Sequence, residues 1–295
     1  MAEGFAYAAP TGLDDAVRLL AEAGSTGQRA QVMAGGTDVL VRMRSVDKAP
    51  RLIVDVKNIP DLNRVDVGAE QVFIGAAVAG ALLSSNTSLV KLLPGMIEAA
   101  DLIGSTQIQG RASIGGNLCN ASPAGDTIPA LIASAGICVI HGPAGSRELP
   151  VEQFVTGVGR NALAAGEVLV GLRFARPKGR TSDAYLRFIP RTEMDIAVAG
   201  VGVSVTLDAG GTCTAARVAI GAVAPTALLV PAAAAALIGT ALDEAALLAA
   251  GRACSAAASP ITDKRGTADY RLKVVAVLCR RAVAIARDRA QGVQA

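Results

Sequence analysis

The sequence has little of the chemistry that most metal sites and hydrolases use, because its 295 residues include one histidine and five cysteines. His141 lies in a turn-like His-Gly-Pro segment, which is typical of a solvated loop residue. One histidine excludes a histidine-rich metal site, and we take it to exclude a Ser/His/Asp triad as well. The cysteines are scattered and never spaced as Cys-x-x-Cys, which argues against a disulfide framework and an internal zinc or iron–sulfur site. They are Cys119, Cys138, Cys213, Cys254 and Cys279.

Strong charge and aromatic side chains are also scarce. The formal net charge is +3, tryptophan is absent and aromatic residues make up 3% of the chain, which argues against binding of nucleic acid or of an anionic membrane surface. The N-terminus lacks a basic segment followed by an apolar run. The longest apolar stretch, Ala227 to Ile238, is about half of the roughly 20 residues that a membrane-spanning helix needs. We therefore expect a soluble, cytoplasmic protein.

The chain is rich in apolar residues, which make up 52% of it, and its length predicts two compact domains or three small ones. Breakers and charges in Arg176 to Arg180 place the main domain boundary there. Before the boundary, hydrophobic periodicity predicts strands at 31–33, 51–56, 71–78, 136–140 and 168–174, and helices at 13–23, 37–43, 82–93, 96–104 and 128–134. After it come strands at 184–189, 196–207 and 215–222, then helices at 227–238, 243–257 and 267–291. Strands followed by helices indicate an α+β domain with an antiparallel sheet.

Two glycine segments stand out in the first domain, Ala34-Gly-Gly-Thr-Asp38 and Ser113-Ile-Gly-Gly-Asn117. Glycine lets the backbone approach a ligand closely and adopt positive φ, so successive N–H groups can converge on an anion. A helix capped by Thr37 would add its positive end. However, a single Gly-Gly pair is most often a turn, and neither segment is a G-x-G-x-x-G or Walker sequence. The residues alone therefore indicate no more than a candidate nucleotide site.

Three polar residues of the second segment and its continuation each allow two interpretations. Asp126 either caps the helix that begins near Thr127 or accepts hydrogen bonds from ligand hydroxyls. Asn117 is either a turn residue or a donor to the ligand. Ser113 either caps locally or forms a hydrogen bond with a phosphate.

With these residues in place, the chain resembles a known family. The two segments, the second of which reads Ser-Ile-Gly-Gly-Asn-Leu-Cys-Asn-Ala-Ser-Pro over 113–123, are similar to the two pyrophosphate loops of the FAD subunit in the xanthine dehydrogenase and aerobic carbon monoxide dehydrogenase family. The likeness covers nearly the whole chain. It includes Phe5-x-Tyr7, Glu167-Val-Leu-Val, Met194-Asp-Ile-Ala-Val-Ala-Gly200 and Asp263-Lys-Arg-Gly-Thr-Ala-Asp-Tyr-Arg271.

The resemblance implies a fold and a site. Residues 1–176 would form a vanillyl-alcohol-oxidase (PCMH) type FAD-binding domain of two α/β subdomains. Residues 181–290 would form a C-terminal α+β domain like that of the carbon monoxide dehydrogenase flavoprotein, with an antiparallel sheet and helices. FAD would lie in a cleft with its diphosphate on the two segments, Asp126 near the ribose or adenine end and Ile196 near the ring. The implied cofactor-binding residues are Gln31, Val32, Met33, Ala34, Gly35, Gly36, Thr37, Asp38, Ile103, Ser113, Ile114, Gly115, Gly116, Asn117, Asp126, Leu169, Arg187 and Ile196.

The chain departs from the family pattern at several positions. Gln107-Ile-Gln-Gly110 stands where the family often has Gln-Ile-Arg-Asn, so an arginine that could support the loop is lost. Arg187 stands where a lysine is common, which keeps the charge but not the geometry. Ile103 replaces an aromatic residue that stacks on the cofactor in eukaryotic relatives. The pair Thr37-Asp38 is similar to the xanthine dehydrogenase branch rather than to the His-Ser of the carbon monoxide branch.

The resemblance also implies a function. The chain would be the electron-transfer subunit of a heteromeric molybdenum hydroxylase, passing electrons from two [2Fe–2S] clusters through FAD to an external acceptor. It has no cluster cysteines and no pterin-site pattern, so a large molybdopterin-binding subunit and a small [2Fe–2S] subunit would carry those centres, in a dimer of heterotrimers. Without a suitably placed histidine, FAD should be bound non-covalently. One alternative is a self-contained flavin-dependent oxidoreductase acting on a small molecule, which predicts an ionisable group over the flavin ring. Another is a non-catalytic nucleotide-binding or scaffold protein.

Overall fold

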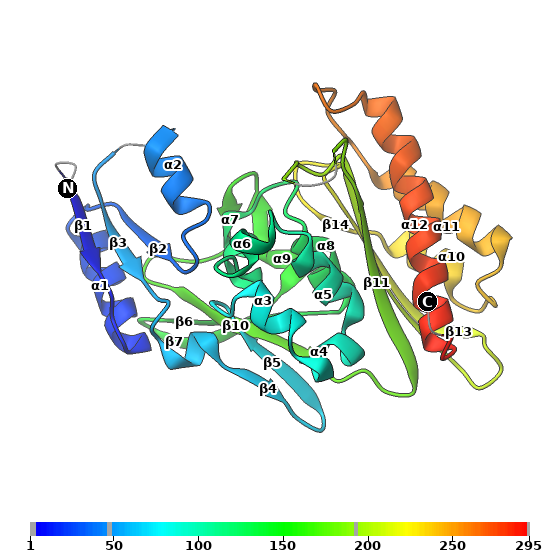
Figure 1. Cartoon of the computed structure of the whole chain (residues 1–295), viewed down its shortest axis with the longest axis horizontal. Coiled ribbons are helices and arrows are strands. Elements are labelled where there is room, and N and C mark those ends of the chain that lie inside the picture. Colours follow the sequence, from blue (N-terminus) through cyan, green and yellow to red (C-terminus); the bar gives the residue numbers. More distant parts are fainter. Residues whose placement is uncertain (1–3, 46–48, 192–193, 294–295) are drawn as a thin grey trace.

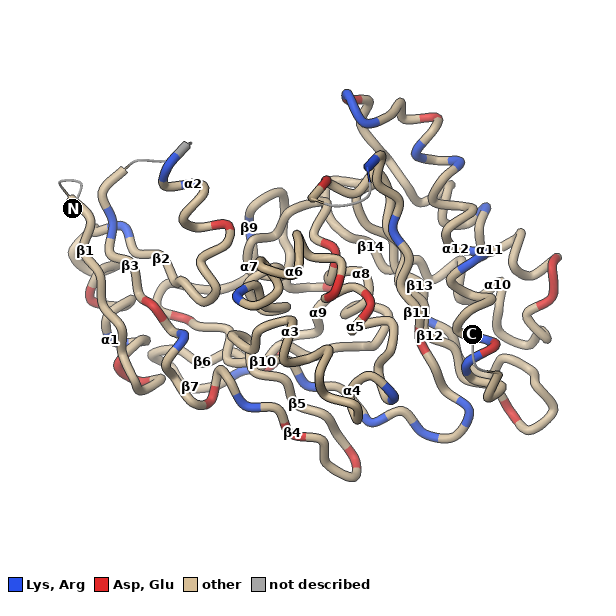
Figure 2. Tube along the Cα trace, viewed as in Figure 1, with Lys and Arg blue, Asp and Glu red and all other residues tan. Residues whose placement is uncertain are grey.

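The computed structural model describes residues 4–45, 49–191 and 194–293, and its three larger sheets lie in a row along the long axis of the molecule (Figure 1). The first two sheets belong to the chain before residue 176 and the third to the chain after it. β10 ends at Ala175 and β11 begins at Arg180, so the polar segment with its breakers lies between two strands. Basic and acidic residues are spread over the whole length of the molecule (Figure 2), consistent with the small net charge.

The first subdomain is a small parallel sheet with the order β1-β3-β2, covered by a helix. Its elements are β1 (Phe5–Ala8), α1 (Leu13–Ser25), β2 (Ala30–Met33), α2 (Val39–Ser45) and β3 (Arg51–Asp55). α1 buries Ala16, Val17, Leu20 and Ala23, the spacing of one helical face. α2 begins at Val39, two residues later than the cap predicted at Thr37.

The second subdomain is a five-stranded antiparallel sheet with the order β4-β5-β10-β6-β7. Its strands are β4 (Val65–Val67), β5 (Gln71–Gly75), β6 (Ile137–Gly142), β7 (Gly145–Pro150) and β10 (Val168–Ala175). Its helices are α3 (Gly80–Ser84), α4 (Thr87–Leu92), α5 (Pro94–Asp101), α6 (Thr106–Gln109), α7 (Ile114–Asn120), α8 (Thr127–Ala133) and α9 (Val151–Phe154). The single-turn η1 (Pro60–Asn63) precedes β4, and the small hairpin β8 (Val155–Gly157) and β9 (Arg160–Asn161) follows α9.

The helix predicted over 82–93 is divided in two, so that prediction was wrong. The side chain of Asn86 accepts hydrogen bonds from the N–H groups of Ser88 and Leu89, each at 3.1 Å, and thereby caps α4. A residue whose side chain satisfies the first N–H groups of a new helix favours that start over continuation of the previous turn.

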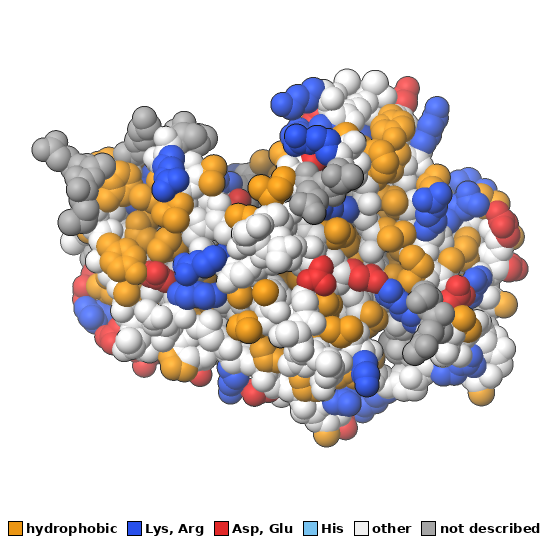
Figure 3. Space-filling view, viewed as in Figure 1, with side chains coloured by type: hydrophobic (Ala, Val, Ile, Leu, Met, Phe, Trp, Pro, Cys, Tyr) orange, Lys and Arg blue, Asp and Glu red, His pale blue; other side chains and the backbone are white. Residues whose placement is uncertain are grey.

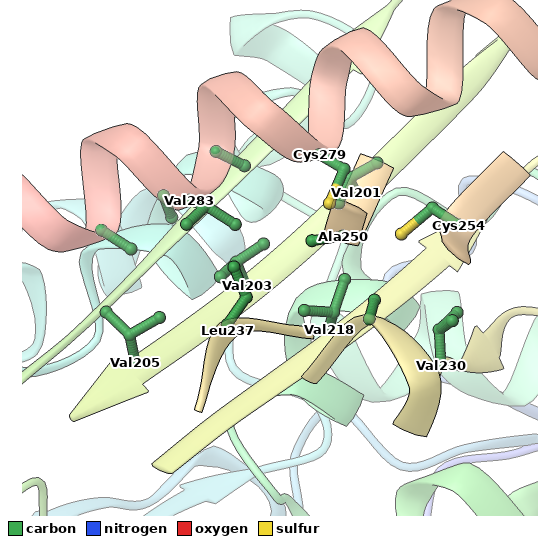
Figure 4. Packing of buried hydrophobic residues seen from close by; sticks show 14 of the residues in the cluster. Val201, Val203, Val205, Val218, Val230, Leu237, Ala250, Cys254, Cys279 and Val283 are labelled. Carbon is green, nitrogen blue, oxygen red and sulfur yellow. The ribbon is translucent and has the colours of Figure 1, made fainter. Parts of the chain in front are cut away.

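The C-terminal domain is an antiparallel sheet with helices on one face, as predicted. Its strands, in sheet order, are β11 (Arg180–Phe188), β12 (Ala199–Leu207), β13 (Cys213–Gly221) and β14 (Leu228–Leu229). α10 (Pro231–Leu237), α11 (Glu244–Ala257) and α12 (Ala268–Ala290) follow. Val201, Val203 and Val205 alternate along β12 and pack with residues of these helices in one apolar cluster (Figure 4), because alternate side chains of a strand share a face.

The opposite face of this sheet packs on α5 and α8 of the second subdomain. Small residues make the contact close. A Cβ on Gly202 would lie 2.5 Å from the carbonyl oxygen of Pro129, and one on Gly95 would lie 2.6 Å from the backbone nitrogen of Ala184. The two domains therefore meet backbone to backbone.

Polar groups strengthen this domain junction. The buried carboxylate of Asp183 on β11 accepts hydrogen bonds from the N–H groups of Gly95 (3.0 Å) and Met96 (3.2 Å) at the start of α5. Burial raises the pKa of Asp183 to about 6, although these backbone hydrogen bonds act in the opposite direction. Glu98, also on α5, accepts from the N–H of Tyr185 at 3.0 Å and forms an ion pair with Arg289 of α12.

Substitution of Asp183 tests this junction. We expect Asp183→Ala to lower the free energy of unfolding by about 1–3 kcal/mol, because two buried N–H groups lose their acceptor. The pKa of Asp183 is about 6 in the folded state and about 3.8 in the unfolded chain. Burying the charged carboxylate therefore costs no stability below pH 3.8, and the full cost is present above pH 6. The stability of the wild type should therefore fall relative to that of Asp183→Asn as the pH rises from 4 to 6. Urea unfolding across this range measures the difference.

Asp243→Asn, at the exposed cap of α11, is the control and should parallel the wild type. Parallel curves for Asp183→Asn and the wild type would contradict this account.

Candidate functional site

A cleft of about 370 Å³ lies between the two subdomains of the first domain, and its lining runs from Ala30 to Leu169. Most of the residues expected at the cofactor line it: Gln31, Val32, Ala34, Gly35, Gly36, Thr37, Asp38, Ile103, Ser113, Gly115, Gly116, Asn117 and Leu169. Both glycine segments thus reach one cavity. Its volume is within the usual range of ligand pockets, about 300–1,000 Å³.

The first glycine segment touches the residues just before the second. A Cβ on Gly35 would lie 2.1 Å from the carbonyl oxygen of Arg111, so only glycine fits there. Arg111 in turn donates from Nε to the carbonyl oxygen of Gly35 at 3.1 Å. Gly36 has φ +78°, which side-chain-bearing residues rarely adopt. Arg111 therefore supports the loop without the arginine that Gln109 replaces.

The second glycine segment is the first turn of α7 rather than a loop, and this corrects the sequence-based expectation. Ser113 caps the helix, because its Oγ accepts from the N–H of Gly116 at 3.1 Å. A Cβ on Gly115 would lie 2.5 Å from the carbonyl oxygen of Ala76, whereas one on Gly116 would meet only Ser113 Oγ, at 3.1 Å. Gly115 therefore allows α7 to pack closely against Ala76, and Gly116 lines the cleft without adding a side chain to it.

Asn117 and Asp126 have separate structural roles. The Oδ1 atom of Asn117 accepts from the N–H (3.3 Å) and the hydroxyl (2.8 Å) of Thr127, which leaves its Nδ2 available as a donor. Asp126 precedes α8 but makes no capping hydrogen bond, so the capping interpretation was wrong. Its Oδ2 instead accepts from Arg187 Nη1 at 2.8 Å, across the domain junction.

The Asp126–Arg187 ion pair is partly buried and incompletely satisfied. Its side chains are 13% and 5% exposed, and Asp126 Oδ1 and Arg187 Nε have no hydrogen-bond partner. Burial raises the pKa of Asp126 to about 6, while the charge of Arg187 acts to lower it. The nearby hydroxyl of Tyr185 also acts to lower the pKa of Asp126.

The remaining expected residues lie apart from the described lining of the cleft. Met33 and Ile114 are buried, and Ile196 is 52% exposed on the C-terminal domain. The sequence reasoning did not identify several lining residues, including Arg42, Cys119, Asn120, Asn161 and Leu163. Cys119 and Asn120 belong to the quoted 113–123 motif, which could have indicated them. The β9 residue Asn161, with its Nδ2 bonded to Cys119 O at 2.9 Å, had no comparable signal.

The described residues give little support for a metal site or a membrane-spanning helix. No group of three or more histidine, cysteine, aspartate or glutamate side chains there could hold a metal ion. None of the helices in that part of the chain is long and apolar enough to cross a bilayer.

His141 does contact Ser146 Oγ (2.8 Å) and Asp14 Oδ1 (3.0 Å), so the exclusion of a Ser/His/Asp arrangement was too strong. These three residues are outside the described lining of the cleft, and Asp14 is almost fully exposed.

Comparisons with known proteins agree with this architecture. Residues 3–177 match the family model of the FAD binding domain in molybdopterin dehydrogenase, and residues 184–286 match that of the CO dehydrogenase flavoprotein C-terminal domain. The chain is 34% identical over 288 residues to the carbon monoxide dehydrogenase medium chain of Afipia carboxidovorans, covering 97% of this chain and 98% of the relative. It is also 34% identical to the xanthine dehydrogenase FAD-binding subunit of Escherichia coli O157:H7, covering 72% of each.

A solved structure shows the same fold. The match to a carbon monoxide dehydrogenase from Hydrogenophaga pseudoflava that lacks the Mo-pyranopterin moiety of its molybdenum cofactor has a TM-score of 0.91 at 35% identity, covering 97% of this chain and 98% of that one. With both domains matched, in this order and over nearly the full length, the chain belongs to the family of FAD-binding subunits of molybdopterin dehydrogenases.

Proposed function

We propose that the chain binds FAD in the cleft and acts as the electron-transfer subunit of a cytoplasmic molybdenum hydroxylase. FAD would take electrons from [2Fe–2S] clusters on a small partner subunit and pass them to an external acceptor. A large molybdopterin-binding subunit would complete the unit, and two such heterotrimers would associate. The observation that carries the proposal is the pair of glycine segments that line one cleft, the first of which packs backbone to backbone against Arg111, two residues before the second.

The residues of the cleft fit a dinucleotide diphosphate. Gly35 to Asp38 line the cavity, so their N–H groups can serve an anionic ligand without a lysine, whereas the N–H groups of Gly116 and Asn117 already donate to Ser113. Nδ2 of Asn117 is a further donor. When bound, FAD itself supplies the redox chemistry, and the protein contributes binding, orientation and electrostatics. The described lining includes one carboxylate, one guanidinium and one thiol, in Asp38, Arg42 and Cys119. It includes no histidine, lysine, glutamate or tyrosine, which favours electron transfer over substrate chemistry in this chain.

Partner binding has support from the surface. Large apolar side chains are exposed on both domains, among them Tyr7, Val41, Met194 and Ile261. On the face in Figure 3, apolar side chains interrupt the charged surface over both domains. Exposed apolar groups of this size are typical of protein interfaces when they gather in patches.

The first test is the state of the flavin. The purified chain should be yellow, and acid or heat should release intact FAD, because His141 lies outside the described lining and burial raises the pKa of the Cys119 thiol to about 12. Absorbance and mass spectrometry of the supernatant and pellet give the answer. Flavin that stays with the precipitated protein would show a covalent link, and Cys119→Ser would then identify whether the thiol carries it.

The second test separates the two glycines of α7. Gly116→Val should weaken FAD binding roughly ten- to hundredfold, because added methyl groups in a packed site cost about 1–3 kcal/mol. The melting temperature of the FAD-free protein should change little, since a Cβ there meets only Ser113 Oγ. Gly115→Val should instead disrupt the fold against Ala76. Gly24→Val, where a Cβ has no neighbour within 4 Å, is the matched control. Wild-type FAD affinity in Gly116→Val would move the site elsewhere.

The third test asks whether the chain needs its partner subunits to oxidise a substrate. Co-expressed with its partners, the chain should purify in a complex with molybdenum, FAD and about four iron atoms per unit, the content of two [2Fe–2S] clusters. The isolated, FAD-loaded chain should accept electrons from an artificial donor but should not oxidise an organic substrate of the complex. Substrate-dependent dye reduction measures this, with metals shown to be absent. Sustained turnover by the isolated chain would favour the self-contained oxidoreductase instead.

A further inference from the structure

We propose that Lys57 and Arg111 are positioning residues of the FAD site, which hold the two glycine segments at a fixed spacing and place positive charge behind the wall of the cleft. This inference deepens the proposed function and rests on it. Neither residue belongs to the described lining of the cleft, so each acts through the main chain that it contacts.

The two cations make reciprocal contacts between the subdomains. Lys57, which follows β3 of the first subdomain, donates from Nζ to the carbonyl oxygen of Ala77 at 2.6 Å. Arg111, from the second subdomain, donates from Nε to the carbonyl oxygen of Gly35 at 3.1 Å. Both acceptor residues, Ala77 and Gly35, line the cleft. Each cation therefore binds a part of the cleft wall that the other subdomain provides.

The Lys57 contact lies beside both glycine segments. Val56, the residue before Lys57, donates from its N–H to the carbonyl oxygen of Met33 at 2.9 Å, immediately before the first segment. Ala76, next to the residue that accepts from Lys57, packs against Gly115 of the second segment. Loss of the Lys57 contact would therefore allow the two segments to move relative to each other.

The Arg111 contact affects a donor of the first segment. The carbonyl group of Gly35 and the N–H group of Gly36 belong to one peptide unit, and Gly36 lines the cleft. A hydrogen bond to the oxygen of a peptide unit polarises that unit and strengthens its N–H as a donor. Arg111 therefore makes the N–H of Gly36 a better partner for an anion.

A buried carboxylate compensates the two cations. Asp55 is 8% exposed, its Oδ1 accepts from the N–H of Lys57, and its Oδ2 accepts from the hydroxyl of Tyr7, each at 2.9 Å. Burial and the charge of Arg111 lower the pKa of Lys57, whereas the charge of Asp55 acts to raise it. The Phe5-x-Tyr7 pattern thus has a role, because Tyr7 holds the carboxylate that lies beside Lys57.

These charges make anion binding dependent on pH. A diphosphate in the cleft should raise the pKa of Lys57, because negative charge favours the protonated amine. The affinity of the full-length wild type for ADP, which has the diphosphate but no flavin ring, should therefore fall roughly tenfold as the pH rises through that pKa. Arg111→Gln should move this fall to higher pH, because it removes a charge that lowers the pKa of Lys57.

Two substitutions of Lys57 separate its charge from its packing. Lys57→Met should weaken binding at neutral pH roughly tenfold and abolish the fall at high pH. Lys57→Arg keeps a charge that does not titrate, so it should retain most of the affinity at neutral pH and lose the fall as well. The profile of Lys57→Arg decides the matter even where Lys57→Met does not fold. Lys91→Met, which removes an exposed lysine of α4, is the control and should follow the wild type.

Titration calorimetry with ADP and with FAD, from about pH 7 to about pH 10, separates this inference from the proposed function. If the wild type binds neither ligand, the proposed function itself is wrong. If it binds either ligand with an affinity that does not change with pH, or if Lys57→Arg or Arg111→Gln keeps the wild-type profile, the positioning role is wrong. A flat profile in the Lys57 variants, with a fall at higher pH in Arg111→Gln, would support it.

Discussion

The cleft depends on three places where a side chain would not fit between two backbones. A Cβ would lie 2.1 Å from Arg111 O at Gly35, 2.5 Å from Ala76 O at Gly115 and 2.4 Å from Leu62 O at Gly75. The first contact joins the two subdomains, and the other two lie within the second subdomain, where Ala76 and Leu62 also line the cavity. Glycine is needed at these positions for packing, and the neighbouring Gly36 and Gly116 line the cavity.

The same kind of contact attaches the C-terminal domain. Gly95 and Gly202 allow α5 and α8 to approach the outer sheet, and Asp183 satisfies the first N–H groups of α5 at that junction. Because α8 begins one residue after Asp126, fixing α8 on β12 and β13 also fixes Asp126 opposite β11. The position of the Asp126–Arg187 ion pair is thus a consequence of domain packing, and not of either residue's local sequence.

The sequence predicted the elements whose pattern is long and regular. α11, α12 and the strands β12 and β13 lie close to the predicted ranges, because their apolar periodicity and the tertiary packing agree. The break at Asn86 and the helix α7 were missed for local reasons. Asn86 ends one helical pattern by capping another, and two glycines make 114–120 a poor helix by propensity. The glycine segments identified most of the cleft, but nothing local could connect Asp126 to a residue 61 positions away in another domain.

The ionisable side chains that line the cleft differ from those of the Asp126–Arg187 ion pair. The described lining of the cleft has a single carboxylate, and burial raises the pKa of its thiol to about 12, so the thiol stays protonated at neutral pH. The charges of Asp126 and Arg187 at the domain junction are instead paired, and a paired charge costs less to bury than a single one. Arg187 alone would be expensive at 5% exposure, and Asp126 compensates it while leaving one donor and one acceptor unsatisfied. The ion pair thereby lowers the cost of placing Arg187 at the domain junction, where a single buried charge would destabilise the fold.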